Sequence, residues 1–176
     1  MATPKYRFIS YPYMQDVAAQ LASKTPTQTM GCMYVYDLPE LAKEVHQIVL
    51  EEVAGNIKEY VEAEGKVIRT VATPVFFQLK ANANNVWASN GYTGLLVPFF
   101  YGTIQILVRV LGGDGEARIN WECGSILHIG EGTGIRPLTG DIVFLCNLFR
   151  LAVRQEATAE KEFDSDAGAS RANEVQ

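Results

Sequence analysis

A glycine-rich loop lies between two β-favouring runs in the C-terminal half of the chain, with the sequence Gly130-Glu131-Gly132-Thr133-Gly134. Loops of this kind hold phosphate groups when Gly-Lys-Ser/Thr opens a helix, or when a helix follows the glycines of a dinucleotide site. Here β-favouring residues surround the glycines, and no lysine follows them. We therefore interpret the loop as a plain β-turn.

Three nearby side chains, Cys123, His128 and Asp141, could in principle act as nucleophile, base and orienting group. Nothing in their spacing requires them to meet, so a histidine in the core is the favoured interpretation of His128. The chain's cysteines, which also include Cys32 and Cys146, show no Cys-x-x-Cys spacing and have apolar neighbours. This pattern predicts buried free thiols, with no disulfide or metal role.

The elements around these residues read as short strands joined by turns. A run over 125–129 leads into the glycine loop, and a turn over 137–141 precedes a nearly continuous apolar strand over 142–153. Short strands separated by Gly, Pro and Asp turns are typical of an antiparallel barrel or jelly roll. Further strands are predicted over 30–36, 67–71, 75–80, 86–89, 95–100, 103–111 and 117–123, with an Asn90-Gly91 turn.

A long amphipathic helix is predicted over 38–64, because apolar residues from Leu41 to Val61 recur at steps of three and four. Asp37 and Glu40 resemble a capping box at its start, and Gly65 suits a left-handed C-terminal cap. A shorter helix over 13–23 is expected to pack on it. The fold class is therefore α+β, with one domain over 1–155 that begins in an extended arm, and a polar tail over 156–176.

Composition restricts the classes of function. The chain has 176 residues, 48% of them hydrophobic, and a net charge of -5. A nucleic-acid partner is not expected, because binding to phosphates normally requires a basic face. No apolar run approaches the roughly eighteen residues of a membrane helix, and no secretory signal opens the chain. We expect a cytoplasmic protein, or one within a soluble particle assembled there.

The region from Val75 to Arg154 resembles the double-stranded β-helix of the cupins and, more closely, of the iron and 2-oxoglutarate dependent dioxygenases. The motifs that carry the resemblance are GSILHI over 124–129, IRPLTGDIVFL over 135–145 and LAVR over 151–154. The resemblance implies an Fe(II) site with two histidines and one carboxylate. It also implies that Arg154 stands where the family pairs an arginine with its co-substrate.

The ligand positions of that family are not matched in this chain. The first two ligands would fall within Trp87–Tyr92 and the distal histidine near Arg150 or Leu151, yet these positions offer neither histidine nor carboxylate. The chain has two histidines, His46 and His128, which cannot rebuild the triad. We therefore predict no metal and no cofactor, and Arg154 is more simply a solvated strand end.

Two strands are apolar on both faces, over 97–101 and 144–149. One face of each must fill the barrel, and the other must meet the helix, a ligand or another subunit. Three explanations stay open: an ordinary two-sided core, a subunit interface and a small-molecule cavity. The interface would use Phe99, Phe100, Tyr101 and Phe149, and the ligand site His128, Arg154, Trp87 and Tyr92.

These observations support three functional hypotheses. The first is a non-enzymatic structural or scaffold subunit of a homo-oligomer or larger assembly, such as a virion-like particle. The alternative is a cupin-like or dioxygenase-like enzyme, or a small-ligand binder, that uses the barrel interior. Polar side chains converging inside the barrel would favour this alternative, and an apolar-filled barrel would count against it. A third hypothesis is an adaptor that dimerises through the helix stripe over 41–61.

Overall fold

The computed structural model describes residues 5–7, 24–81, 83, 86–100, 102–112 and 115–154. In this part of the chain, helix α2 (Glu40–Ala63) accompanies a series of strands. The strands are β1 (Lys5–Arg7), β2 (Gln28–Met30), β3 (Met33–Tyr36), β4 (Lys66–Val71), β5 (Val75–Leu79), β6 (Val86–Trp87), β7 (Tyr92–Pro98), β8 (Thr103–Val110), β9 (Glu116–Glu122), β10 (Ser125–Ile129), β11 (Thr133–Pro137) and β12 (Ile142–Val153).

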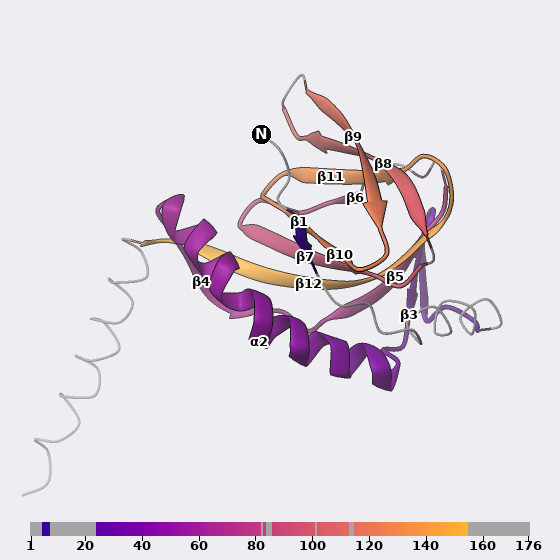
Figure 1. The fold of residues 1–176 in the computed structure, drawn as a ribbon, viewed down its shortest axis with the longest axis horizontal. Helices are drawn as coiled ribbons and strands as arrows, with labels where there is room; N and C mark the ends of the chain where they lie inside the picture. The colour runs from indigo at the N-terminus through magenta and orange to yellow at the C-terminus, as the bar shows by residue number, and fades with distance from the viewer. Residues whose placement is uncertain are drawn as a thin grey trace, which may run out of the picture.

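The strands form two antiparallel sheets that face each other (Figure 1). The larger sheet has the order β1-β10-β7-β12-β5-β3-β2, with β4 also paired to β12, and the smaller has the order β6-β11-β8-β9. From β5 onward the chain passes back and forth between the two sheets, and α2 lies across the outer face of the larger sheet. The predicted α+β jelly roll, or double-stranded β-helix, is confirmed.

Helix α2 buries its apolar stripe against the larger sheet. The stripe residues are at most 4% exposed, and they are Val45, Val49, Val53, Ile57 and Val61. Leu95, Val97 and Ile126 of the sheet belong to the same core cluster. The stripe is therefore core of the chain itself, which contradicts the hypothesis of an adaptor that dimerises through this helix.

The two ends of α2 differ in how well the sequence predicted them. Gly65 follows the helix at a φ of 73°, as expected for a left-handed cap. The capping box was wrong: Pro39, in an extended conformation, is the N-cap and makes no side-chain cap bond. Asp37 lies two residues before that cap, too far back to serve the first turn.

The sequence predicted two parts of the fold wrongly because of glycine turns. One turn divides the strand predicted over 30–36, and the other precedes β11. The single strand predicted over 30–36 is a hairpin of β2 and β3, with Gly31 at a φ of 61° in the turn. The short strand β11 was not predicted, because it follows directly on the glycine loop and holds only Thr133–Pro137. Gly132, at a φ of 64°, forms that loop as a turn, as the sequence indicated.

A second core fills the space between the sheets. Trp121 lies at its centre, with ring centroids 5.1 Å from Phe100 and 6.1 Å from Phe144. Strands β7 and β12 thus bury side chains on both faces, one towards this core and one towards α2. The two-sided core explains the doubly apolar strands.

This packing places the residues predicted for a subunit interface. Phe99 and Phe149 lie in the core under α2, and Phe100 lies between the sheets, so all three rings are buried within the chain itself. A neighbouring subunit would have to be contacted by other side chains. Tyr101, the predicted helix over 13–23, most of the N-terminal arm and the tail lie outside the described residues.

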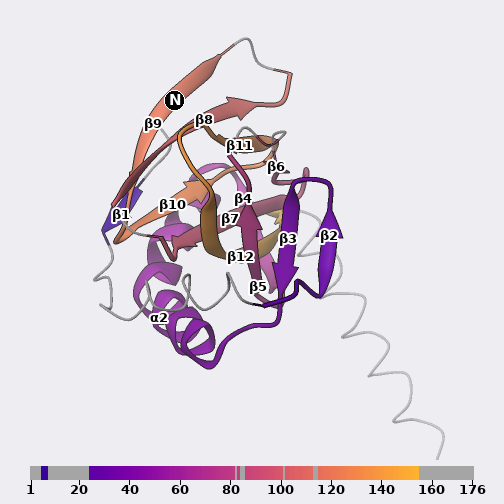
Figure 2. The ribbon, with the colours of Figure 1, turned by 90° about the vertical axis from the view of Figure 1, so that its right-hand side faces the viewer.

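Strand β1 is the described part of the predicted arm, and it pairs with β10 at the edge of the larger sheet. Figure 2 shows this edge beside β9, and the β2–β3 hairpin at the opposite edge. The division of the chain into a domain and a tail stays a prediction. Among the described residues, no helix is long and apolar enough to span a membrane.

Candidate functional site

His128 lies beneath α2 and not inside the barrel. Along β10, Leu127 and Ile129 point between the sheets, whereas Ile126 and His128 point towards the helix. The His128 ring is 1% exposed and meets the Tyr60 ring edge to face, with centroids 4.6 Å apart. The expectation that His128 lines the barrel interior is therefore corrected: strand alternation directs it to the other face of the sheet.

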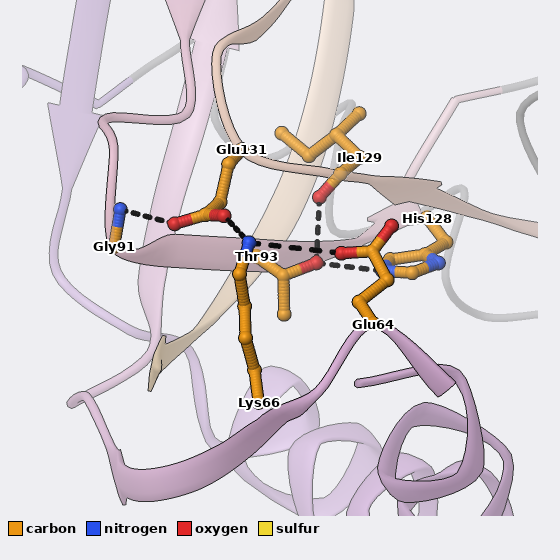
Figure 3. Close-up of polar contacts among 7 residues, drawn as sticks. All are labelled: Glu64, Lys66, Gly91, Thr93, His128, Ile129 and Glu131. Atoms are coloured by element: carbon orange, nitrogen blue, oxygen red, sulfur yellow. Dashed lines mark hydrogen bonds and ion pairs between the residues drawn. The ribbon is translucent and has the colours of Figure 1, made fainter. Parts of the chain in front are cut away.

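A hydroxyl group fixes the orientation of the His128 ring (Figure 3). Thr93 Oγ1 lies 2.6 Å from His128 Nε2, and the same hydroxyl donates to the Ile129 carbonyl at 2.9 Å. A hydroxyl carries one proton, so with that proton donated to Ile129 it accepts at Nε2. The hydrogen-bond network thus assigns the neutral ring as the Nε2–H tautomer.

Burial keeps the His128 ring neutral. Removal from water lowers its pKa from 6.5 to about 4, although the nearby carboxylate of Glu64 acts in the opposite direction. At neutral pH the cluster of His128, Thr93 and Tyr60 is thus an uncharged polar contact between α2 and the larger sheet.

A charged rim lies beside this cluster, built around Glu131 (Figure 3). One Glu131 oxygen accepts from the Gly91 N–H at 2.5 Å, and the other pairs with Lys66, whose ammonium group also lies 3.8 Å from Glu64. Partial burial alone would raise the pKa of Glu131, but the hydrogen bonds from Lys66 and Gly91 leave it below its usual value. The rim ties β4 and the start of β7 to the turn after β10.

A second polar contact, partly buried, joins the first half of α2 to the larger sheet. His46 Nδ1 is 2.5 Å from Asn147 Oδ1, and the Asn147 side chain, which is fully buried, also donates to the Leu95 carbonyl at 3.5 Å. Both histidines of the chain therefore join α2 to the larger sheet. The His46 contact gives the buried Asn147 amide a partner, as buried polar groups require.

The arrangement around His128 offers little access for chemistry. A hydroxyl beside an imidazole is the pairing found in nucleophilic catalysis, but Thr93 and His128 are each 1% exposed. Asp141 is held elsewhere, by Lys80 at 2.7 Å and by the Ala81 N–H at 2.9 Å. Cys123 directly follows β9 and donates its N–H to the Gly102 carbonyl. These contacts do not bring Cys123, His128 and Asp141 together as a nucleophile, a base and an orienting group.

The cysteines follow the sequence prediction in part. All three are free, and burial raises the pKa of the Cys146 thiol to about 12. Cys32 and Cys123 are only half-buried.

The residues predicted for a ligand site lie on or directly after different strands, and His128 lies on β10. Trp87 belongs to the short edge strand β6, and its side chain lies outside the described part. Tyr92 begins β7, half-buried, and the sheet register sets it opposite Arg150. Arg154 is exposed beyond β12 and donates its N–H to the Gly65 carbonyl at 3.3 Å.

The positions where the resembled family holds iron do meet in space. Tyr92 is paired with Arg150, and the Leu151 N–H donates to Gly91 at 2.8 Å. No imidazole belongs to these positions, and the carboxylate that reaches them, from Glu131, is engaged by Gly91 and Lys66. Within the described ranges no group of three His, Cys, Asp or Glu side chains is arranged to hold a metal. These residues do not fit an iron ion.

Sequence reasoning missed the Lys66–Glu131 rim. The two residues are 65 positions apart, and neither carries a local pattern that pairs it with the other. The one available signal was the position of Glu131 between Gly130 and Gly132. Glycines on both sides allow the backbone to turn sharply there, which can direct the side chain back towards the sheet. That signal indicates a turn, but it does not identify a partner.

One consequence for stability follows from the lowered pKa of His128. The unfolded chain takes up a proton near pH 6.5 and the folded chain only near pH 4, so between these values the unfolded state binds more protons. The free energy of unfolding should therefore fall as the pH drops through this window, by a total approaching about 3 kcal/mol. Above pH 6.5 this contribution should be constant.

The measurement is urea unfolding of the natural chain and of His128→Gln at about pH 5 and about pH 7.5. Carboxylates such as Glu131 and Asp141, whose pKa values are lowered, contribute stability that is lost at still lower pH, equally in both proteins. The difference between the two profiles isolates the histidine. Parallel profiles for both proteins would contradict the buried neutral ring.

Comparisons with known proteins identify the architecture. No protein family and no curated protein matches the chain by sequence. Among solved structures, a prolyl-4-hydroxylase from Pseudomonas putida aligns at a TM-score of 0.57 and 12% identity, over 84% of this chain and 91% of that one. HygX from Streptomyces hygroscopicus, with nickel and 2-oxoglutarate bound, aligns at 0.55 and 9%, over 83% and 81%.

A third solved structure shows a weaker likeness. Vicilin from hazelnut, Corylus avellana, aligns at a TM-score of 0.40 and 12% identity over 75% of this chain, which spans only 34% of the vicilin chain. Identities this low show the fold alone. The alignments with the prolyl-4-hydroxylase and HygX, at TM-scores of 0.57 and 0.55, confirm the predicted resemblance as a shared double-stranded β-helix fold.

Proposed function

We propose that this chain, a double-stranded β-helix, is a non-enzymatic structural or scaffold subunit of a larger protein assembly. The observation that carries the proposal is the filling of the barrel. The buried side chains between the sheets are apolar over most of their extent, with Trp121, Phe144 and Phe100 packed together at the centre. Such a barrel serves as a rigid core, and its outer surface is what a partner meets.

The surface of the described part offers strand edges and apolar side chains. Every residue of β2, which ends the larger sheet, is exposed. The large exposed apolar side chains, which are 44% to 62% accessible, lie at strand ends and are Met30, Val71, Val110, Leu111 and Val153. Unpaired strand edges are templates for pairing with another chain. A subunit that binds neighbours through edges and strand ends, in a virion-like or other particle, accounts for this distribution.

Light scattering on the purified full chain tests the proposal. We expect a mass of several chains, because a structural subunit associates with its own copies through these edges. The expected particle has either one defined mass or a mass that rises with concentration. A protein that stays at the mass of one chain up to about 1 mM would contradict self-assembly.

The alternative function is a cupin-like or dioxygenase-like enzyme, or a small-ligand binder. The observation that favours it is the alignment with HygX, whose structure holds nickel and 2-oxoglutarate, over four-fifths of both chains. The apolar interior and the side chains within Trp87–Tyr92 count against it. Calorimetric titration of 2-oxoglutarate with Mn(II) distinguishes the two functions: we expect no saturable heat, and stoichiometric binding would favour the alternative.

A further inference from the structure

Strand β9 forms one border of the smaller sheet (Figure 2). It pairs with β8 through all seven residues, from Glu116 to Glu122, in one continuous antiparallel register. In the part of the chain that the structure describes, no strand pairs with its other side. Most of its side chains are exposed, so β9 presents a long, regular edge.

The side chains on the outer face of β9 carry charges of both signs. Glu116, Arg118, Asn120 and Glu122 share this face and are exposed, whereas Trp121 points into the barrel. Glu116 lies 3.8 Å from Arg109 of β8. Arg118 and Glu122 form no ion pair with any described residue. The two charges that lack an ion-pair partner in this part of the chain are thus opposite in sign, and Asn120 lies midway between them.

This order makes the edge complementary to a second copy of itself. In an antiparallel pair centred on Asn120, residues two places before and two places after the centre face each other across the strands. Arg118 of each copy then lies opposite Glu122 of the other, and the contact occurs twice. A pair centred one residue earlier would instead set Glu116 against Glu122, which is unfavourable because directly opposed like charges repel.

We propose that two copies of this chain associate through β9, antiparallel about Asn120, so that two four-stranded sheets become one continuous sheet. The contact is isologous, because the same edge serves both copies around a twofold axis. It rests on the proposed function as an assembly subunit, and it names the partner and the contact. Main-chain hydrogen bonds between the edges provide the association, and the two ion pairs fix the register.

Charge reversal tests this register. Arg118→Glu sets two carboxylates opposite each other at both contacts, and Glu122→Arg sets two guanidinium groups there. Each single change should raise the dimer dissociation constant by about tenfold or more, whereas the double variant R118E/E122R should return to within about threefold of the natural chain. Sedimentation equilibrium at low salt measures the constants, and added salt should reduce the differences.

Lys58→Glu is the matched control for Arg118→Glu, because it makes the same change in net charge at an exposed position of α2. It should leave the dissociation constant unchanged. Circular dichroism and melting temperature establish that all variants are folded. These β9 positions are exposed, so their substitution should change stability little.

The outcomes separate this contact from the proposed function. If the chain assembles but the single charge reversals have no effect, or the double variant is not restored, the β9 contact is overturned and the assembly function stands. If the dimer dissociation constants change as expected in the charge-reversal variants, yet the protein binds stoichiometric 2-oxoglutarate and metal, the β9 contact stands and the structural function fails. A chain that is monomeric throughout overturns both.

Discussion

Replacement of Val49 by aspartate is expected to unfold the domain. Val49 is fully buried in the stripe by which α2 packs on the larger sheet, among Val45, Val53 and Leu95. A carboxylate at that place has no counter-charge within the core, and it either stays charged at a large cost or takes up a proton and lies unpaired. We expect a loss of about 4 kcal/mol or more, a large part of the stability of a domain of this size.

Urea unfolding followed by circular dichroism measures this loss. Gln47→Asp is the matched control, because it places the same carboxylate in the same helix at an exposed position. The control should change the free energy of unfolding by about 0.5 kcal/mol at most. A folded Val49→Asp protein that had lost only self-association would contradict the packing and restore the helix-mediated dimer.

Replacement of Trp121 by alanine is expected to have the second largest effect. The Trp121 ring is fully buried, meets Phe100 edge to face, and donates its indole N–H to the Ser125 carbonyl at 2.7 Å. Its removal leaves a large cavity between the sheets and an unpaired carbonyl. Substitutions of this kind cost about 3–5 kcal/mol, and the barrel cannot close around the gap because both sheets are held at other strands.

The measurement is the free energy of unfolding from urea titration. Thr103→Ala, at an exposed position of the neighbouring strand β8, is the control and should be close to neutral. Loss of less than about 1 kcal/mol in Trp121→Ala would show that the ring borders a hydrated space. That result would favour a ligand site inside the barrel and count against the structural function.

Local sequence patterns predicted most of the fold, because its elements carry regular spacing. Strands β4, β10 and β12 were predicted to within one residue at each end, since each lies between turn residues such as Gly65, Gly124 and Gly140. Helix α2 was evident from its stripe. The Pro39 cap, the division between β2 and β3, and the strand β11 were not predicted, because single residues in turns decide them.

The candidate site was less predictable than the fold, because the site depends on which face of the sheet each residue occupies. His128 lies on β10, an apolar strand that is buried on both faces. Its residues do not alternate in polarity, so the sequence does not indicate which face of the sheet the His128 side chain occupies. The contacts of His128 with Thr93 and of Lys66 with Glu131 join segments far apart in the chain. Tertiary packing alone brings them together. The pairing of β10 with β7 places His128 beside Thr93, and the pairing of β4 with β12 sets the position of Lys66.

Native mass spectrometry of the full chain, which counts subunits and bound metal in the same particle, tests the central claim most directly. The claim is that this fold acts through its outer surface and uses its barrel as a packed core. The account predicts ions of several chains whose mass is that of the polypeptide alone. Single chains that each carry one metal ion would contradict it, and would return the function to the barrel interior.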